Sequence, residues 1–495
     1  MPALPPSSRA LSALALAAGL TLAGAMPRPA LATELLAAWA GAEQHDPELS
    51  VARAARAGAR PLLEQAAALW RPGVQLVASA GAASHDSDTR GAHFAAPGMG
   101  ENDGVDFSTS VHGGTATRWA LQASQPLYHP QRRVQQQQLR LQADAAELQW
   151  QAAHQQAMLR TAERYLDAAL AQQALQLTRQ QLQAVQRALE EAQERFRIGD
   201  APITDTHEAG ARLAALQAQE LAAQVALQVK LRLLADTTGL PPETLRPQLP
   251  AAAPTATAAS AATALPLAHW QQQAEDANPG IRLRRLAQEL ARAEADKHSA
   301  RAAPSVELVA QAGQERLHGS GDFGRARNSA RSASVGVQLT VPLYTGGMRE
   351  ARQEQALRQL EQAQAQVDST RQQVASQTHA AWLGLSAGAQ RVQALDQALK
   401  ASQSRLDATR TGREAGDRTL LDWLNAQNDA AATELALSQA RGDLLLGGLR
   451  LALLAGQLDE QRLRMASQAL AASSTAEAAA HAATGSAQKK TSEKQ

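Results

Sequence analysis

The residue types that most often carry chemistry are scattered along this chain. Its 12 histidines include no His-x-x-x-His pair, which would place two imidazoles on one helix face for a metal. Residues 384–388 match Gly-x-Ser-x-Gly, but they lie inside a long helical pattern and not at the strand-to-helix turn that would present a nucleophilic serine, and no Gly-x-x-x-x-Gly-Lys loop could hold phosphates. Without cysteine, the chain has neither disulfides nor thiolate metal sites. The sequence therefore predicts no catalytic residue, no bound metal and no cofactor, and we expect that the protein is not an enzyme.

Two polar segments could in principle bind a ligand. Residues 319–324 match Gly-x-Gly-x-x-Gly, but a strand pattern follows them where a dinucleotide site needs a helix N-terminus. Asp86, Asp88, Asp103 and Asp106 could attract cations, yet a solvated loop is the better interpretation. The formal net charge is only +1, so no bulk field favours nucleic acid, and we expect no nucleic-acid partner.

The first 32 residues have the pattern of a signal peptide. Arg9 supplies a positive charge, residues 11–25 are apolar or small, and Ala30-Leu31-Ala32 matches a cleavage site. A membrane anchor is the alternative, but the apolar run is shorter than the ~20 residues that a spanning helix needs. We expect export and a mature chain that begins near Thr33.

The rest of the chain reads as two copies of one unit. Asp46-Pro47 recurs as Asn278-Pro279 at an offset of 232 residues, and Gly199-Asp200 recurs as Gly416-Asp417 at an offset of 217. Chance similarity would not keep such regular offsets over many markers. We predict a first repeat at 33–245, a Pro- and Ala-rich linker at 246–264, a second repeat at 265–470 and a disordered tail at 471–495.

Each copy contains two segments with the period-2 alternation of a β-strand. Val335, Val337 and Leu339, for example, alternate with Gly336 and Gln338. Each segment has about ten residues, the length of a tilted strand that crosses a bilayer. A soluble sandwich with one wet face is the alternative, but four strands joined by polar loops make a poor sandwich. The predicted strands are ~73–83, ~118–127, ~304–313 and ~333–343, and the loop of the first pair, Ser84 to Thr117, is 16 residues longer than that of the second.

Unusually long helices accompany these strands. Residues 131–198 contain neither Pro nor Gly, and a helix of that length would extend about 100 Å. Residues 349–415 show a similar 3-4 spacing of apolar side chains. Two pairs of shorter helices are predicted at 47–70 with 202–238, and at 279–302 with 418–455. Each pair adds up to about the length of one long helix, as a cylinder wall of uniform height requires.

Four membrane-length strands cannot close a barrel by themselves, and lipid tolerates no open sheet edge. Barrels start at about eight strands, so several chains must combine their strands: two chains would give eight strands and three chains would give twelve. Three chains would also supply twelve helix widths around a ring, too many for side chains to fill the centre of the ring. The predicted fold is therefore mainly α with membrane β, a homotrimeric 12-stranded β-barrel continued by a 12-helix α-barrel.

These features resemble the TolC-like family of outer-membrane exit ducts. The resemblance covers nearly the whole mature chain and is carried by Arg195-Phe196-Arg197-Ile198-Gly199 with Ile203-Thr204-Asp205, by Gly416-Asp417-Arg418-Thr419-Leu420-Leu421-Asp422, by the Asp46-Pro47 and Asn278-Pro279 pairs, and by Pro342-Leu343-Tyr344-Thr345-Gly346-Gly347. It implies a channel across the outer membrane and periplasm of a Gram-negative bacterium, passing exported proteins (type I secretion) or small toxic compounds. The implied partners are a periplasmic adaptor, an inner-membrane ABC or proton-driven transporter, and outer-membrane lipid.

The resemblance also implies a gate at the helix–helix turns. In such proteins a Thr-Asp pair on one turn bonds to an Arg on the other, and carboxylates on the second turn ring a constriction. By match, Thr204, Asp205 and Arg418 are the expected gate residues, and Asp422 is the expected pore-constriction residue. For Asp205 the alternative is a helix-end residue that only favours the positive N-terminus.

Two positions depart from the family pattern. Arg413 stands where the best-known member has a Tyr, so we expect the gate to be held partly through Arg413. Asn425 replaces a second ring carboxylate, so we expect a less negative pore constriction.

Two other function classes stay open at the level of the sequence. A periplasmic membrane-fusion adaptor would carry one helical hairpin and small β domains, which the duplicated strand pairs oppose. A structural coiled-coil protein would have no use for strands of bilayer length. The cargo is not indicated by the sequence.

Overall fold

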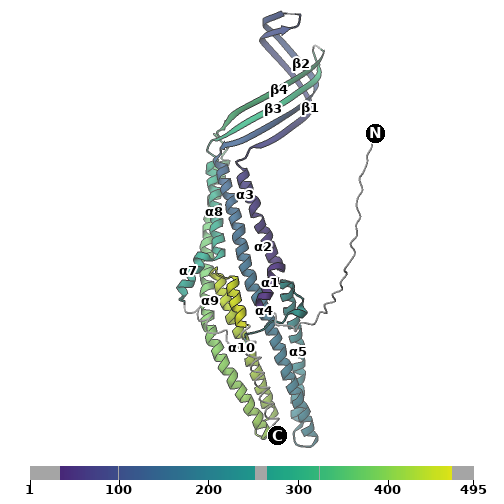
Figure 1. Cartoon of the computed structure of the whole chain (residues 1–495), viewed down its shortest axis with the longest axis vertical. Coiled ribbons are helices and arrows are strands. Elements are labelled where there is room, and N and C mark those ends of the chain that lie inside the picture. Colours follow the sequence, from purple (N-terminus) through teal and green to yellow (C-terminus); the bar gives the residue numbers. More distant parts are fainter. Residues whose placement is uncertain (1–33, 99, 251–264, 323, 471–495) are drawn as a thin grey trace, which may run out of the picture.

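The computed structural model describes residues 34–98, 100–250, 265–322 and 324–470. The chain is elongated, with a four-stranded sheet at one end and two long helical hairpins that run to the other end (Figure 1). The predicted signal peptide and tail, and most of the predicted linker, lie outside the described residues.

Two helices run through almost the whole helical part, α4 (Pro130–Arg197) and α9 (Met348–Glu414), as their sequence patterns predict. Shorter helices lie along them (Figure 1): α2 (Pro47–Ala57), α3 (Ala59–Ala68) and α5 (Ile203–Thr238) along α4, and α8 (Pro279–Ala300) and α10 (Leu420–Leu454) along α9. None of the described helices is both long enough and apolar enough to cross a membrane.

The helix predicted at 47–70 is interrupted. The N–H of Gly58 bonds to Ala55 O at 3.1 Å, a tighter closure than the i−4 bond of an α-helix, and α3 restarts at Ala59. Glycine is less favourable than alanine inside a helix, which suits an interruption by a single tighter turn at this place.

Short helices lie around the middle of the molecule. α1 (Leu35–His45) and the helical residues 460–470 contribute to its largest core, whereas α7 (Leu267–Ala277) buries Trp270 and Ala274 in separate clusters. Buried side chains from α1, α4, the end of α5 and α10 meet in one cluster that includes Trp39, Tyr165 and Leu449. The end of the predicted first repeat and the start of the predicted linker also pack here, because Leu245 is buried and the Gln248 N–H donates to the Tyr165 hydroxyl at 3.1 Å.

The paired markers of the two copies occupy equivalent places. Asp46 caps α2 and Asn278 caps α8, and each side chain accepts two backbone N–H groups just before a proline-started helix. Asp and Asn both make good N-caps, and proline fits the first helical position. Gly239 and Gly456 likewise follow α5 and α10 in the left-handed conformation, at φ 69° and 66°. The recurring residues therefore mark helix ends.

The four strands form one antiparallel sheet in the order β1-β2-β3-β4. They are β1 (Gly73–Ala96), β2 (Gly100–Tyr128), β3 (Ser305–Gly321) and β4 (Gly324–Thr340). The prediction of about ten residues per strand is therefore wrong, and β4 ends at Thr340, before the predicted 343.

The predicted loop from Ser84 to Thr117 is wrong for a related reason. Most of it continues β1 and β2 as a hairpin that extends beyond β3 and β4 (Figure 1). Register shifts interrupt it between Ala83 and His85 and again between Thr89 and Phe94. These irregularities, and polar residues on both faces, hide the period-2 pattern from the sequence.

The two faces of the sheet differ in polarity. Side chains directly opposite in an antiparallel pair share a face, so the register assigns these residues to one face, here called the apolar face: Val74, Leu76, Trp119, Leu121, Val306, Leu308, Val335, Val337 and Leu339. All except the half-buried Val306 are exposed, and Val335 is 76% exposed. The polar face carries Gln75, Gln122, Glu307, Gln311 and Gln338. One side of the sheet thus exposes a large apolar surface.

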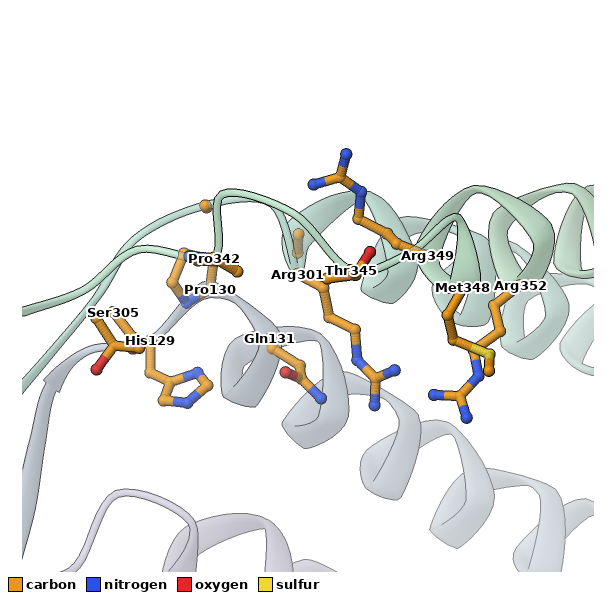
Figure 2. A pocket seen from close by; sticks show the side chains of 13 residues that line it. His129, Pro130, Gln131, Arg301, Ser305, Pro342, Thr345, Met348, Arg349 and Arg352 are labelled. Carbon is orange, nitrogen blue, oxygen red and sulfur yellow. The ribbon is translucent and has the colours of Figure 1, made fainter.

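The sheet joins the helices through short segments. Residues 341–347 lead from β4 to α9, and Gly346 and Gly347 both have positive φ, which glycine adopts without strain. Beside them lies a shallow pocket lined by Gln131, Arg301 and Arg352, whereas Arg349 points away from these three (Figure 2). On the other side of α4's first turn, Arg132 pairs with Glu307 of β3 at 3.2 Å. The Arg132–Glu307 ion pair thus joins the first turn of α4 to the sheet.

Candidate gate and pore-constriction residues

The two helix–helix turns lie together at the end of the molecule farthest from the sheet (Figure 1). Gly199 and Gly416 close α4 and α9 with φ of 79° and 86°, conformations that favour glycine. In both turns the next aspartate's N–H returns to the helix, from Asp200 to Arg195 O and from Asp417 to Gly412 O, each at 2.8 Å. The two turns are thus built in the same way.

An apolar cluster holds the two hairpins together just above these turns. It buries residues of α4, α5 and α10: Val185, Ala188, Ala192, Ala209, Leu216, Leu420 and Leu424. Because α10 packs on α4 as well as on α9, the two hairpins of one chain lie side by side here. The predicted gate residues therefore belong to one compact end of the protein.

Thr204 and Asp205 lie in the first turn of α5. Thr204 is exposed and Asp205 is half-buried, and the Asp205 N–H donates to Pro202 O at 3.3 Å. The carboxylate of Asp205 thus stands where the positive end of the helix dipole stabilises a negative charge. This placement suits both a gate residue and a helix-end residue.

Arg418 is exposed in the turn before α10. Its side-chain carbons lie over Gly412, where an added Cβ would come within 2.9 Å of Arg418 Cγ. Among the described residues of one chain, the ion pairs formed at this end of the molecule do not join Arg418 to Asp205.

Arg413 makes the best-defined polar contact at this end. Its guanidinium pairs with Glu191 of α4, and its Cζ lies 5.1 Å from the centre of the Trp423 ring. The Arg413 side chain is only 17% exposed, so both interactions are partly shielded from water. Arg413 therefore joins α9 to α4 and to α10.

Glu191 and Trp423 were not among the predicted site residues. Glu191 lies in a run of exposed charged residues near the end of α4, and Trp423 has the spacing of an ordinary packing residue. The sequence offers no signal that pairs either with Arg413, which lies 222 residues from Glu191.

Asp422 forms a capping box with Thr419. Its carboxylate accepts the Thr419 N–H at 3.1 Å, and the Thr419 hydroxyl accepts the Asp422 N–H at 3.1 Å. The backbone hydrogen bond from Thr419, followed by its side-chain contact, lowers the pKa of Asp422 below its usual value. Asp422 is thus charged at neutral pH and fixed at the tip. Asn425 is exposed one turn further along α10.

The sequence of the chain matches the model of a known protein family. The family model described as "Outer membrane efflux protein" matches residues 40–240 and residues 270–457. The chain belongs to the outer membrane efflux protein family. The predicted resemblance to outer-membrane exit ducts is therefore confirmed, and the location is the outer membrane of a Gram-negative bacterium.

Individual members of the outer membrane efflux protein family resemble the chain over much of its length. It is 29% identical over 310 residues to the alkaline protease secretion protein AprF of Pseudomonas aeruginosa, covering 62% of this chain and 63% of that protein. It is 30% identical over 274 residues to the outer membrane efflux protein BepC of Brucella suis, covering 55% and 57%. The chain thus aligns with somewhat under two thirds of these relatives.

A solved structure confirms the fold over a larger share. The outer membrane protein VceC of Vibrio cholerae superposes with a TM-score of 0.66 at 21% identity, covering 86% of this chain and 97% of that one. Outer membrane efflux proteins form channels without catalytic chemistry, so the expectation that this chain is not an enzyme is also confirmed.

Proposed function

We propose that three copies of this chain form an exit duct, in which a 12-stranded barrel lies in the outer membrane and a 12-helix tube extends into the periplasm. The observation that carries the proposal is the sheet. Its apolar face is exposed in one chain, and β1 and β4 form its two edges in the strand order. Lipid would cover the apolar face, and sheet edges of neighbouring copies would pair with each other.

The number three follows from the strand and helix geometry. Two copies would give eight strands, and the side chains inside such a barrel fill it, which is incompatible with a duct. Three copies give twelve strands and leave a lumen lined by the polar face, with Gln75, Gln122 and Gln338. The two hairpins of each chain, packed side by side, would supply consecutive parts of the tube wall.

Protein export is the cargo class that the relatives favour. AprF and the Proteases secretion protein PrtF of Dickeya chrysanthemi are named for protease secretion, whereas BepC is named as an efflux protein. The duct would receive exported proteins from an inner-membrane ABC transporter through a periplasmic adaptor. Small toxic compounds from a proton-driven pump are the second cargo class.

The tips of the hairpins would form the gate of this duct. Thr204, Asp205 and Arg418 are proposed to hold the tips inward, with Arg413 as an additional tie within each chain. Asp422 and Asn425 are proposed to line the constriction, where three copies of Asp422 would attract cations. Support for these roles comes from the position of all six residues at one end of the molecule.

The proposal is tested by mass and by conductance. The full-length chain, expressed in a Gram-negative host, should fractionate with the outer membrane, have the mass of a trimer in detergent, and form ion-conducting pores in planar bilayers. Recovery only in the soluble periplasm, or a stable monomer or dimer as the largest species, would contradict it.

A further inference from the structure

The apolar face of the sheet changes character along the strands. On β4 the apolar side chains give way to arginine after Ala333, with Arg331, Arg327 and Arg325 at alternate positions. On β3 the same face continues beyond Ala312 through Gln314, Arg316 and His318, which pair in register with Arg331, Ser329 and Arg327. Four arginines therefore lie on one face, here called the arginine patch: Arg316, Arg325, Arg327 and Arg331.

The arginine patch has no acidic partner within the described part of the chain. All four arginines are exposed, and the hydrogen bonds that two of them form are with neutral groups. Arg316 donates to the side-chain oxygen of Gln314 at 3.4 Å, and Arg327 donates to His318 Nδ1 at 3.0 Å. The ion pairs of the described residues include none of these four arginines, so the patch has an uncompensated positive charge.

The opposite face at the same height is different. Arg118 of β2 lies there directly opposite Glu315 of β3, so its charge has a counter-charge in the register. On β4 the residues of that face are Ala330, Asn328 and Ser332, without any charge. The arginines are therefore gathered specifically on the side that carries the apolar band.

The height of the arginine patch fits a membrane surface. From Leu339 to Arg331 the strand advances by eight residues, about 26 Å at ~3.3 Å per residue, or about 20 Å along the barrel axis at a tilt of ~40°. The apolar band of an outer-membrane barrel is about 25 Å tall. Trp119 lies in the same row as Arg331, and Tyr128 and Tyr344 are exposed at the other boundary, as expected of aromatic residues at the two interfaces.

We propose that the arginine patch binds the phosphate groups of lipid A in the outer leaflet of the outer membrane. This inference rests on the proposed barrel, in which the apolar face contacts lipid and the helices lie on the periplasmic side. The patch then faces the outer leaflet, whose lipid carries phosphates. Guanidinium groups bind phosphate through paired hydrogen bonds, and four of them on two adjacent strands can contact both phosphates of one lipid A.

Lipopolysaccharide binding by the purified trimer in detergent tests this inference, with the Arg316→Gln/Arg327→Gln/Arg331→Gln triple variant compared with the wild type. We expect about tenfold weaker binding of the triple variant, because several charge-assisted hydrogen bonds are lost. The Arg118→Gln variant is the matched control, since it removes an arginine of the same height from the polar face. It should bind like the wild type.

The ligand is varied in the same experiment. Lipid A from which both phosphates have been removed should bind the wild type and the triple variant equally weakly. Equal binding of intact lipopolysaccharide to the two proteins, or an equal loss in Arg118→Gln, would overturn the inference. So would binding of phosphatidylglycerol vesicles as tight as that of lipopolysaccharide. A triple variant that keeps the trimer mass and the outer-membrane location but binds normally refutes only the patch, whereas a wild type absent from the outer membrane refutes the proposed function.

Discussion

Arg413 of α9 reaches across to Glu191 of α4 and at the same time lies over the ring of Trp423 on α10. Its guanidinium thus contacts two helices besides its own at the end where the predicted gate residues gather. A partly shielded pair and a cation–π contact each contribute on the order of 0.5–1 kcal/mol. Interactions of this size can bias a closed tip without locking it.

Replacing Arg413 by Ala should loosen the tip of each chain. Because three copies would lose the contact, the closed-to-open ratio should fall by up to about fivefold for each pair lost. Glu191→Gln should act in the same direction but less strongly, since the contact with Trp423 remains. Single-channel conductance in planar bilayers measures the change, and a conductance equal to the wild type in both variants would show that this pair only supports packing.

Asp205→Ala and Arg418→Ala test the predicted gate. If Asp205 on one helix–helix turn pairs with Arg418 on the other, either variant should raise the conductance without changing the mass of the oligomer. Asp205→Asn removes the charge and so weakens both the proposed pair and the interaction with the helix dipole, whereas Arg418→Ala leaves the N-terminus of α5 intact and tests the pair alone. Unchanged conductance in all three variants would assign Asp205 to the helix end alone.

Asp422 should influence ion selectivity more than closure. Its lowered pKa keeps it ionised at neutral pH, so Asp422→Asn should reduce the cation preference measured from reversal potentials in a salt gradient. Thr419→Ala removes the other half of the capping box but no charge. It should leave the selectivity unchanged, and an equal loss in both variants would mean that the cap, and not the ring charge, matters.

The Asp46–Arg160 pair should make stability depend on pH. The Asp46 side chain is 2% exposed and lies 2.6 Å from Arg160. Burial alone would raise the pKa of Asp46, but hydrogen bonds from Arg160, Leu49 and Glu48 outweigh it and lower the pKa. This contribution is complete above the unfolded-state pKa of about 4 and is lost as the pH falls through the lower folded-state value.

Arg160→Met should therefore destabilise the protein by about 3 kcal/mol at neutral pH, because a buried carboxylate is left without its cation. The deficit, measured by urea unfolding, should shrink below about pH 4. Asp46→Asn should cost less than Asp46→Ala, since Asn278 performs the same capping role in the second copy. A deficit of Arg160→Met that does not change with pH would contradict the assignment.

The distal part of the β1–β2 hairpin should be dispensable for assembly. Beyond the Asp86–Ser110 pair, the two strands pair only with each other, while β3 ends at Gly321. Replacing residues 87–109 by a two-residue Asn-Gly turn should leave the mass of the oligomer and the outer-membrane location unchanged. Loss of the trimer on this deletion would show that the hairpin contacts neighbouring copies.

Local patterns predicted the parts of the structure that depend on local chemistry. The run of residues without Pro or Gly gave α4 within a residue at each end, and Asp46 and Asn278 marked the starts of α2 and α8. Gly199 and Gly416 marked the two turns, because the left-handed conformation favours glycine. Strands were visible where apolar and polar side chains alternate between the two faces, as at Val335 and Leu339.

Only the tertiary structure decided the rest. Where both faces of a strand are polar, as in the hairpin beyond Ala83, alternation carries no signal, and the pairing of backbone groups sets the strand length. The contact between Arg413 and Glu191 was also not predictable from the sequence, because it depends on how α4 and α10 pack. Local sequence determines where helices begin and end, whereas contacts between distant segments depend on the whole fold. The sequence by itself therefore located the two helix–helix turns but not the contact between Arg413 and Glu191.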